Sequence, residues 1–272
     1  MEHTFYRPSS PLCLFVYSTG AISYASNCAT AVASASLFSG QRLAKVASVL
    51  DQLRPSMTEY QMTRAIRANR LYRSVVDIFL GTRGSFRFCP TTGIDDSVSK
   101  ANALYVEQEK CLQLFVAVIF RDSELAWFAS TKLHRFGPLH SGTFYPYVCA
   151  FYRGMAAVSM LVYSYASKRE FIEVLKSSIK QLRKGRKRGV ENISHRLYLL
   201  EAEYAAFRKK HTSAKKFYLL AIEHAALAGV TFENAFTCEK FAEWNLGQEN
   251  HDMMYKQIRE AHRLYLMWGK QH

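Results

Sequence analysis

Apolar residues recur at every third or fourth position along most of the chain, which is the spacing of amphipathic helices. Alanine and serine dominate residues 20–37, so this segment predicts a helix that packs closely against its neighbours, with Ser39-Gly40 at its end. Helical spacing continues over 43–53, and Pro55 predicts the end of that helix because proline cannot donate a backbone hydrogen bond. Residues 56–59, Ser-Met-Thr-Glu, have the form of a capping box and predict a further helix from there to Gly81.

The middle of the chain shows the same alternation of helix and turn. Residues 81–96 carry several glycines, and Asp96 or Ser97 is expected to cap a helix whose apolar positions run from Leu104 to Ile119. The Arg121-Asp122 pair predicts a turn. Further helices are expected over 123–133, 144–166 and 168–184. The pattern therefore predicts an all-α protein built from pairs of helices.

Two segments of the C-terminal third, 197–229 and 237–269, match at an offset of 40 residues. The matched pairs include Ala202 with Ala242, Glu203 with Glu243, His211 with His251, Ala221 with Ala261, and Gly229 with Gly269. Small residues thus recur where two helices of a hairpin approach, and glycine recurs where the second helix ends. This pattern is typical of helical-hairpin repeats such as the tetratricopeptide (TPR) class, whose period is ~34 residues and whose relatives reach ~40–47.

The sequence therefore predicts an all-α, right-handed superhelical solenoid of about five to six helix hairpins, TPR-like in architecture. We assign this solenoid to residues 19–268, with a weak internal boundary near 81–97. Residues 1–18 form an N-terminal extension, for which disorder is one interpretation. Residues 269–272 form a short tail.

Composition supports a folded, basic, helical protein. Hydrophobic residues make up 49% of the 272 positions, which excludes global disorder. Only 13 glycines and 6 prolines occur, too few for the many tight turns of a β-sandwich or propeller. Lysine and arginine total 36 against 22 acidic residues, a formal net charge of +14. A charge of this sign favours acidic partners, either protein or nucleic acid.

The uncharged stretch from Pro8 to Gln41 raises the question of targeting. Its longest strictly apolar run is only residues 12–17, whereas a membrane span needs ~20 apolar residues, so no membrane association is expected. A signal peptide is also a poor match, because the basic and apolar regions are too short. An organelle transit peptide remains the alternative, since Glu2 is the one acid in residues 1–50. The favoured interpretation is a tightly packed helix in a cytoplasmic protein.

Four runs of the chain resemble a known family. The longest are HRLYLLEAEYAAFRKKHTSAKKFYLLAIEHAALAGVTFENAF (195–236) and CEKFAEWNLGQENHDMMYKQIREAHRLYLMWG (238–269), followed by GTFYPYVCAFYRGMAAVSMLVY (142–163) and ASLFSGQRLAKVASVLDQL (35–53). They resemble the TPR-like repeats of large signalling proteins that join a Ser/Thr kinase-like domain, a P-loop signalling ATPase, these repeats, a GAF sensor and a histidine kinase. The resemblance covers about residues 19–268 and is most specific at the Tyr-x-x-Trp-Gly end.

The resemblance implies a regulatory or scaffolding role rather than catalysis. The family's repeat region contributes no catalytic residues, and this chain has no G-x-x-x-x-G-K-[ST] phosphate loop, kinase catalytic loop or phosphoacceptor histidine region. The chain ends at His272, where the family continues into its sensor. We therefore expect the repeats alone, as a stand-alone protein or a fragment, with no enzymatic activity and no cofactor.

The basic run from Lys168 to Arg188 is the strongest candidate for a binding site. It holds nine lysines and arginines against two glutamates. The candidate partner-binding residues are Lys180, Arg183, Lys184, Arg186, Lys187 and Arg188. They are compatible with an acidic protein partner, with nucleic acid, or with a nuclear import signal. The plainer alternative is a solvated helix end, where cations are favoured by the helix dipole.

Other side chains give weaker signals. The nine histidines form no metal-binding motif, so no metal site is expected. The six cysteines lack Cys-x-x-Cys spacing, which favours reduced, buried thiols, although an even number also permits disulfides. Asp95-Asp96 is compatible with a cation site but is better explained by a helix cap. Asn192 begins a glycosylation sequon without a secretory signal.

The sequence therefore predicts a non-catalytic protein-interaction scaffold in signal transduction, whose partner is a peptide segment or an adjoining signalling domain. A nucleic-acid-binding helical repeat that uses residues 168–188 is the alternative. An enzyme is the least supported class.

Overall fold

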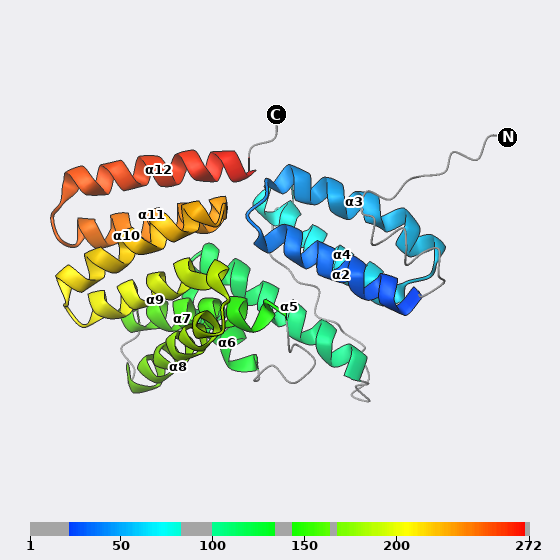
Figure 1. Cartoon of the computed structure of the whole chain (residues 1–272), viewed down its shortest axis with the longest axis horizontal. Helices are drawn as coiled ribbons and strands as arrows, with labels where there is room; N and C mark the ends of the chain where they lie inside the picture. Colours follow the sequence, from blue (N-terminus) through cyan, green and yellow to red (C-terminus); the bar gives the residue numbers. More distant parts are fainter. Residues whose placement is uncertain (1–21, 83–99, 134–142, 164–167, 270–272) are drawn as a thin grey trace. The chain divides into compact units, whose positions relative to one another are not determined.

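The computed structural model describes residues 22–82, 100–133, 143–163 and 168–269 (Figure 1). These ranges contain eleven α-helices and no β-strand, which confirms the all-α class. The helices are α2 (Ile22–Phe38), α3 (Leu43–Glu59), α4 (Thr63–Phe79), α5 (Lys100–Ile119), α6 (Ser123–Lys132), α7 (Tyr145–Tyr163), α8 (Lys168–Lys187), α9 (Ser194–Phe207), α10 (His211–Leu227), α11 (Thr231–Leu246) and α12 (His251–Gly269), with the 3₁₀ turn η2 (Glu191–Ile193) before α9.

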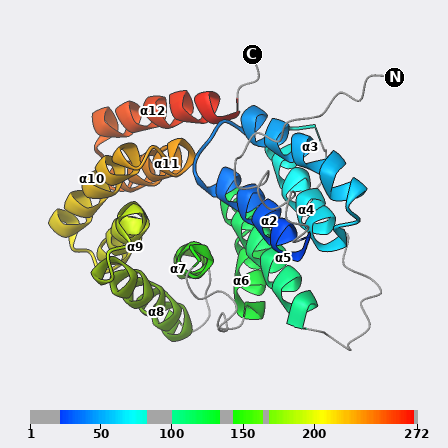
Figure 2. The same cartoon turned by 45° about the vertical axis from the view of Figure 1, so that its right-hand side comes forward.

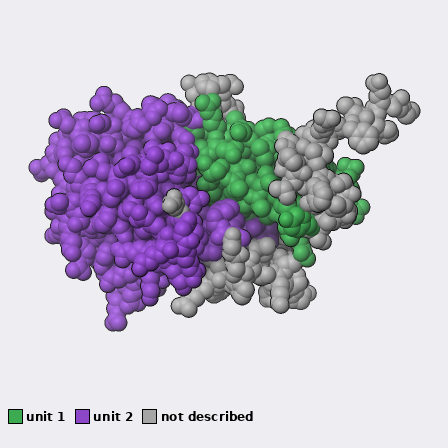
Figure 3. Space-filling model, viewed as in Figure 1, with its two compact units in different colours: residues 1–86, 268–272 green, residues 87–267 purple. Residues whose placement is uncertain are grey.

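The chain divides into two compact units (Figure 3). Unit 1 comprises residues 1–86 with 268–272, and unit 2 comprises residues 87–267. The expected internal boundary near 81–97 stays a prediction. The assignment of 19–268 to one superhelical solenoid stays a prediction.

In unit 1, helices α3 and α4 form a hairpin against which α2 packs. The apolar cluster between them contains Ala25 and Ala29 of α2 together with Met57, Met62 and Ala65. Because alanine side chains are short, α2 lies close to its neighbours, as its composition predicts. The expected helix over 20–37 is therefore confirmed from Ile22 onward.

Two predictions for unit 1 are wrong. Helix α3 does not end before Pro55 but continues to Glu59, and the segment 56–59 is its last turn rather than a capping box. Helix α4 instead begins at Thr63, after an N-cap residue that makes no side-chain cap hydrogen bond. The physical reason is Met57, which is fully buried in the cluster described above. Burial of a methionine side chain, at about 1.5–3 kcal/mol, offsets much of the ~3 kcal/mol cost of an internal proline.

Unit 2 is a row of helix hairpins. The hairpins α5–α6, α7–α8 and α9–α10 are each packed pairs, and each pair contacts the next through α6 with α7, α8 with α9, and α10 with α11. Alternate helices also pack, α5 with α7 and α7 with α9. The last hairpin is held by Ala235 and Cys238 of α11 against Ala261 and Leu264 of α12. Figures 1 and 2 show α9 to α12 side by side in chain order, as a helical repeat requires.

The approach of α7 to α9 depends on Gly154. A β-carbon at this position would lie 2.6 Å from the Cδ1 atom of Leu200, which is itself fully buried. Only glycine therefore allows this distance between the two helices. The predicted aromatic helix over 144–166 is observed as α7, and residues 164–167 lie outside the described residues.

The turns are consistent with the predicted 40-residue repeat. Within the described ranges, turns inside hairpins place a non-glycine residue in the left-handed region, at Gln61, Arg121, Lys209 and Glu249. Turns after α2, α4, α8 and α10 place glycine there, at Gly40, Gly81, Gly189 and Gly229. Lys209 and Glu249 are 40 residues apart, and the equivalent amides of Lys210 and Asn250 donate to the carbonyls five residues earlier at 2.9 and 3.0 Å. His211 and His251 begin α10 and α12, as the repeat predicts.

Candidate functional site

The basic run lies on α8 and on the turn that follows it. Helix α8 buries Phe171, Leu175, Ile179 and Leu182, so its cations lie on the opposite, exposed face. The structure extends this helix to Lys187, three residues beyond the expected end.

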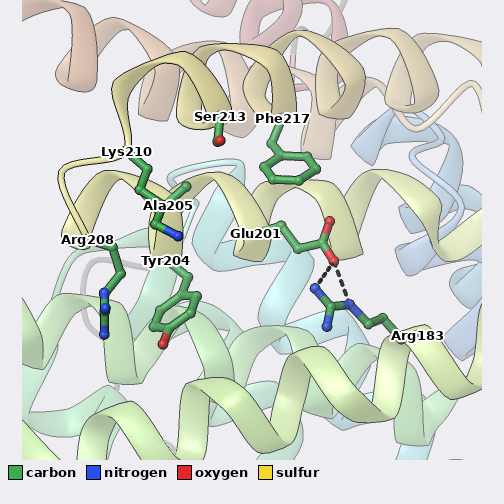
Figure 4. A pocket seen from close by; sticks show the side chains of 8 residues that line it. All are labelled: Arg183, Glu201, Tyr204, Ala205, Arg208, Lys210, Ser213 and Phe217. Carbon is green, nitrogen blue, oxygen red and sulfur yellow. Dashed lines mark hydrogen bonds and ion pairs between the residues drawn. The ribbon is translucent and has the colours of Figure 1, made fainter.

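An open groove runs along this face of α8 and across α9 (Figure 4). One part, of about 300 Å³, is lined by Arg183, Glu201, Tyr204, Ala205, Arg208, Lys210, Ser213 and Phe217. The adjoining part, of about 610 Å³, is lined by Lys176, Ile179, Lys180, Arg183, Lys184, Lys187 and Tyr204. Both parts share Arg183 and Tyr204, so they form one continuous surface, which we call the basic groove.

Three helices build the basic groove. Helix α8 supplies one side, α9 the floor, and the N-terminal turns of α10 the other side, as Figure 4 shows. Tyr204 is central because it lines both parts of the groove. The ammonium of Lys176 lies 6.0 Å from the centre of its ring. Phe217 stacks on Tyr198, with ring centres 6.3 Å apart, so its position on the far side is fixed by an aromatic contact.

The groove is strongly positive. Seven of its lining residues are lysine or arginine, and the one carboxylate among its lining residues belongs to Glu201. Arg183 donates from Nε to Oε1 of Glu201 at 2.7 Å, and Glu201 is only 9% exposed. This pair neutralises one cation and leaves the other six available to an acidic ligand.

The structure separates the six predicted partner-binding residues. Lys180, Arg183, Lys184 and Lys187 line the basic groove. Arg186 packs over the ring of Tyr198 instead, with its guanidinium carbon 4.9 Å from the ring centre. Arg188 is exposed in the turn after α8 and is not among the residues that line the groove.

Sequence reasoning missed Lys176, Arg208, Lys210, Tyr204 and Phe217. Lys176 was detectable, because it lies four positions before Lys180 and therefore on the same face of α8. The basic turn over 208–210 was also visible in the sequence, but only the packing of α9 against α8 brings it to the groove. The aromatic residues gave no signal that separates them from core positions.

A second group of ionisable side chains is buried in unit 2. The carboxylate of Glu233 accepts hydrogen bonds from Tyr152 (3.1 Å) and from Nε of Arg196 (2.8 and 3.0 Å), and it also contacts Nε2 of His195. Burial alone would raise the pKa of Glu233. The combined effects of Arg196 and His195 are larger and lower this pKa to about 2. Burial lowers the pKa of His195, so its neutral ring donates the Nε2 proton. These four side chains are at most 6% exposed, so they form a buried polar network that joins α7, α9 and α11.

Glu203 of α9 has the opposite character. Its side chain is half-buried and accepts a hydrogen bond from the hydroxyl of Tyr218 at 3.0 Å. Burial raises its pKa to about 7, against smaller lowering effects from Lys240 and Tyr218. Glu203 therefore exchanges its proton near neutral pH.

The cysteines agree with the expectation of buried, free thiols. Cys111, Cys149 and Cys238 are buried and Cys28 is half-buried, all four without a disulfide. The sulfurs of Cys111 and Cys149 lie 2.6 Å apart between α5 and α7. Two of the six cysteines, Cys13 and Cys89, lie outside the described residues, and so do Asp95, Asp96 and the cap expected at Asp96 or Ser97.

Within the described ranges, neither a membrane-spanning helix nor a metal-binding cluster is present. None of their helices combines the length and the apolar character needed to cross a bilayer. No three His, Cys, Asp or Glu side chains in those ranges gather closely enough to hold a metal ion.

Comparisons with known proteins leave the basic groove as the main guide to function. No protein-family model, curated protein or solved structure matches the chain. The resemblance to TPR-like signalling repeats therefore stays a prediction.

Proposed function

We propose that this chain is a non-catalytic helical-repeat module that binds a segment of a partner protein in the basic groove and acts as a scaffold in signal transduction. The observation that carries the proposal is the groove itself, where six unneutralised cations surround Tyr204 and Phe217. Cations attract and orient an acidic segment, and the half-buried rings of Tyr204 and Phe217 give contact area at low entropic cost. Consecutive hairpins supply the rigid surface that such recognition needs.

A nucleic-acid ligand is the second candidate, because lysines around an aromatic ring also suit phosphates and bases. Glu201 favours the protein ligand. Its carboxylate lies beside Arg183 in the floor of the groove and would repel a phosphate backbone that follows it. A protein segment can place an uncharged side chain at this point.

The test uses two triple variants with equal loss of charge. The groove variant is Lys180→Gln with Lys184→Gln and Lys187→Gln, and the control variant is Lys168→Gln with Lys215→Gln and Lys216→Gln. The control lysines are exposed and do not line the groove. Neither set carries the ion pair of Arg183, so both variants are expected to fold.

Peptides are selected against the purified chain from a displayed random library and measured by fluorescence anisotropy. We expect the selected peptides to bind the groove variant at least about tenfold more weakly than the wild type, and the control variant nearly as well as the wild type. The proposal fails if selection yields no peptide or if both variants weaken binding equally. Tighter binding of oligouridine than of any peptide, lost in the groove variant, would favour nucleic acid instead.

A further inference from the structure

The cations of α8 form a regular row. Lys176, Lys180, Lys184 and Lys187 follow each other at steps of four, four and three residues and line the same part of the groove. With a rise of about 1.5 Å per residue, successive lysine side chains originate about 4.5–6 Å apart along the helix axis. The row as a whole is about 16 Å long.

An extended peptide matches this spacing. Its residues advance about 3.3 Å each and its side chains alternate between two sides, so every second side chain points the same way at intervals of about 6.6 Å. Carboxylates at alternate positions therefore meet successive lysines of α8. About five extended residues span the row, so three alternate carboxylates lie along it and a fourth lies just beyond its end.

The intervening side chains of such a peptide point to the opposite side of the groove, where the chemistry changes. That side is Phe217 and Ser213 of α10, with Ala205 and Tyr204 in the floor between (Figure 4). The part of the groove that these residues line, about 300 Å³, is large enough for an aromatic or branched aliphatic side chain. Phe217 and Tyr204 would cover such a side chain on two sides.

Building on the proposed protein-binding role of the groove, we propose that its ligand is an extended acidic segment in which carboxylates alternate with apolar side chains. The carboxylates lie along α8, and the apolar side chains lie against Tyr204 and Phe217. The backbone runs above α9, parallel to the row of lysines. This arrangement pairs both chemical halves of the groove at once, whereas a uniformly acidic segment would leave the aromatic half uncovered.

Two peptides of identical composition test the alternation, ELEFELE and EEEELFL, both with blocked ends and a fluorescent label. We expect the alternating peptide to bind at least about tenfold more tightly than the block peptide, and its affinity to fall steeply with salt. Replacing its phenylalanine by serine, as ELESELE, should weaken it about tenfold without any change in the protein. The groove variant should lose the preference, and the control variant should keep it.

The outcomes separate this inference from the function on which it rests. Equal binding of both peptides, or equal binding of ELESELE, overturns the alternation but leaves a protein-binding groove in place. If library-selected peptides bind but ELEFELE does not, the alternation is likewise overturned and the protein-binding groove remains. Failure of every peptide, or binding that the groove variant does not weaken, overturns the proposed function as well. Displacement of ELEFELE only by oligouridine, and by no acidic peptide, overturns both.

Discussion

Removing the charge of Glu233 is expected to destabilise the chain strongly. Its pKa falls from 4.5 to about 2 in the folded chain because Arg196 and His195 outweigh the effect of burial. At about 1.36 kcal/mol per pKa unit, this difference corresponds to about 3 kcal/mol of stability at neutral pH. Glu233→Gln also leaves the buried guanidinium of Arg196 without its counter-ion, so we expect a loss of about 3–5 kcal/mol.

Glu203 provides the matched control, because the same substitution should act in the opposite direction. Burial raises its pKa to about 7, so ionisation of Glu203 opposes folding above that pH. A glutamine remains neutral and keeps an acceptor for the hydroxyl of Tyr218. By the same conversion as for Glu233, Glu203→Gln is expected to increase stability by up to about 3 kcal/mol near pH 8, with a gain that disappears near pH 4.

Urea unfolding followed by far-UV circular dichroism, at about pH 8, 6 and 4, measures both effects. The stability that Glu233 contributes is present above pH 4.5 and is lost as the pH falls towards about 2, so the deficit of its variant shrinks in acid. The stability gained by a protonated Glu203 is lost as the pH rises from 4.5 towards about 7. The reasoning is refuted if both variants shift stability in the same direction, or if Glu233→Gln costs less than about 1 kcal/mol.

Three further predictions concern backbone, packing and thiols. Gly229→Ala should lower the free energy of unfolding by about 1–2 kcal/mol, measured by thermal unfolding, because the φ of Gly229 is +67°. Gly247→Ala, at φ −67°, should be neutral or stabilising. Equal effects of the two substitutions would contradict the turn assignment. Gly154→Ala should cost about 1–3 kcal/mol by overpacking, and an unchanged melting temperature would contradict it. Burial raises the pKa of the Cys149 thiol, so iodoacetamide should label Cys28 before Cys149 in peptide maps; the reverse order would count against burial.

The sequence was sufficient for the helical class and for the pairing of adjacent helices, because both depend on local spacing. The equivalence of His211 and His251, at the first positions of α10 and α12, followed from the 40-residue offset alone. Pro55 shows where local rules fail. Its effect on α3 is decided by the burial of Met57 against α2 and α4, which no single segment reveals. The superhelical course of a solenoid likewise depends on small rotations between hairpins that residue spacing does not encode.

The sequence predicted only some of the residues that line the basic groove. The cluster of charges on α8 drew attention to Lys180 and Lys184, and both line the groove. Arg186 belongs to the same cluster but lies over Tyr198, because the helix turns it towards α9. Phe217 was indistinguishable from a core residue, since only the packing of one hairpin on the next decides which aromatic side chains stay accessible.

The regular placement of glycines in the left-handed conformation determines how hairpins can be added to this chain by duplication. Residues 190–229 follow one such glycine and end with another, so this block starts and finishes with the same kind of turn. A tandem duplication of the block, inserted after Gly229, would deliver the chain to the start of α11 in an unchanged backbone conformation. Insertions of other lengths at that point would shift the phase between the turns and the helix faces. The chain can therefore be lengthened in whole blocks, each adding one hairpin, by a single in-frame event.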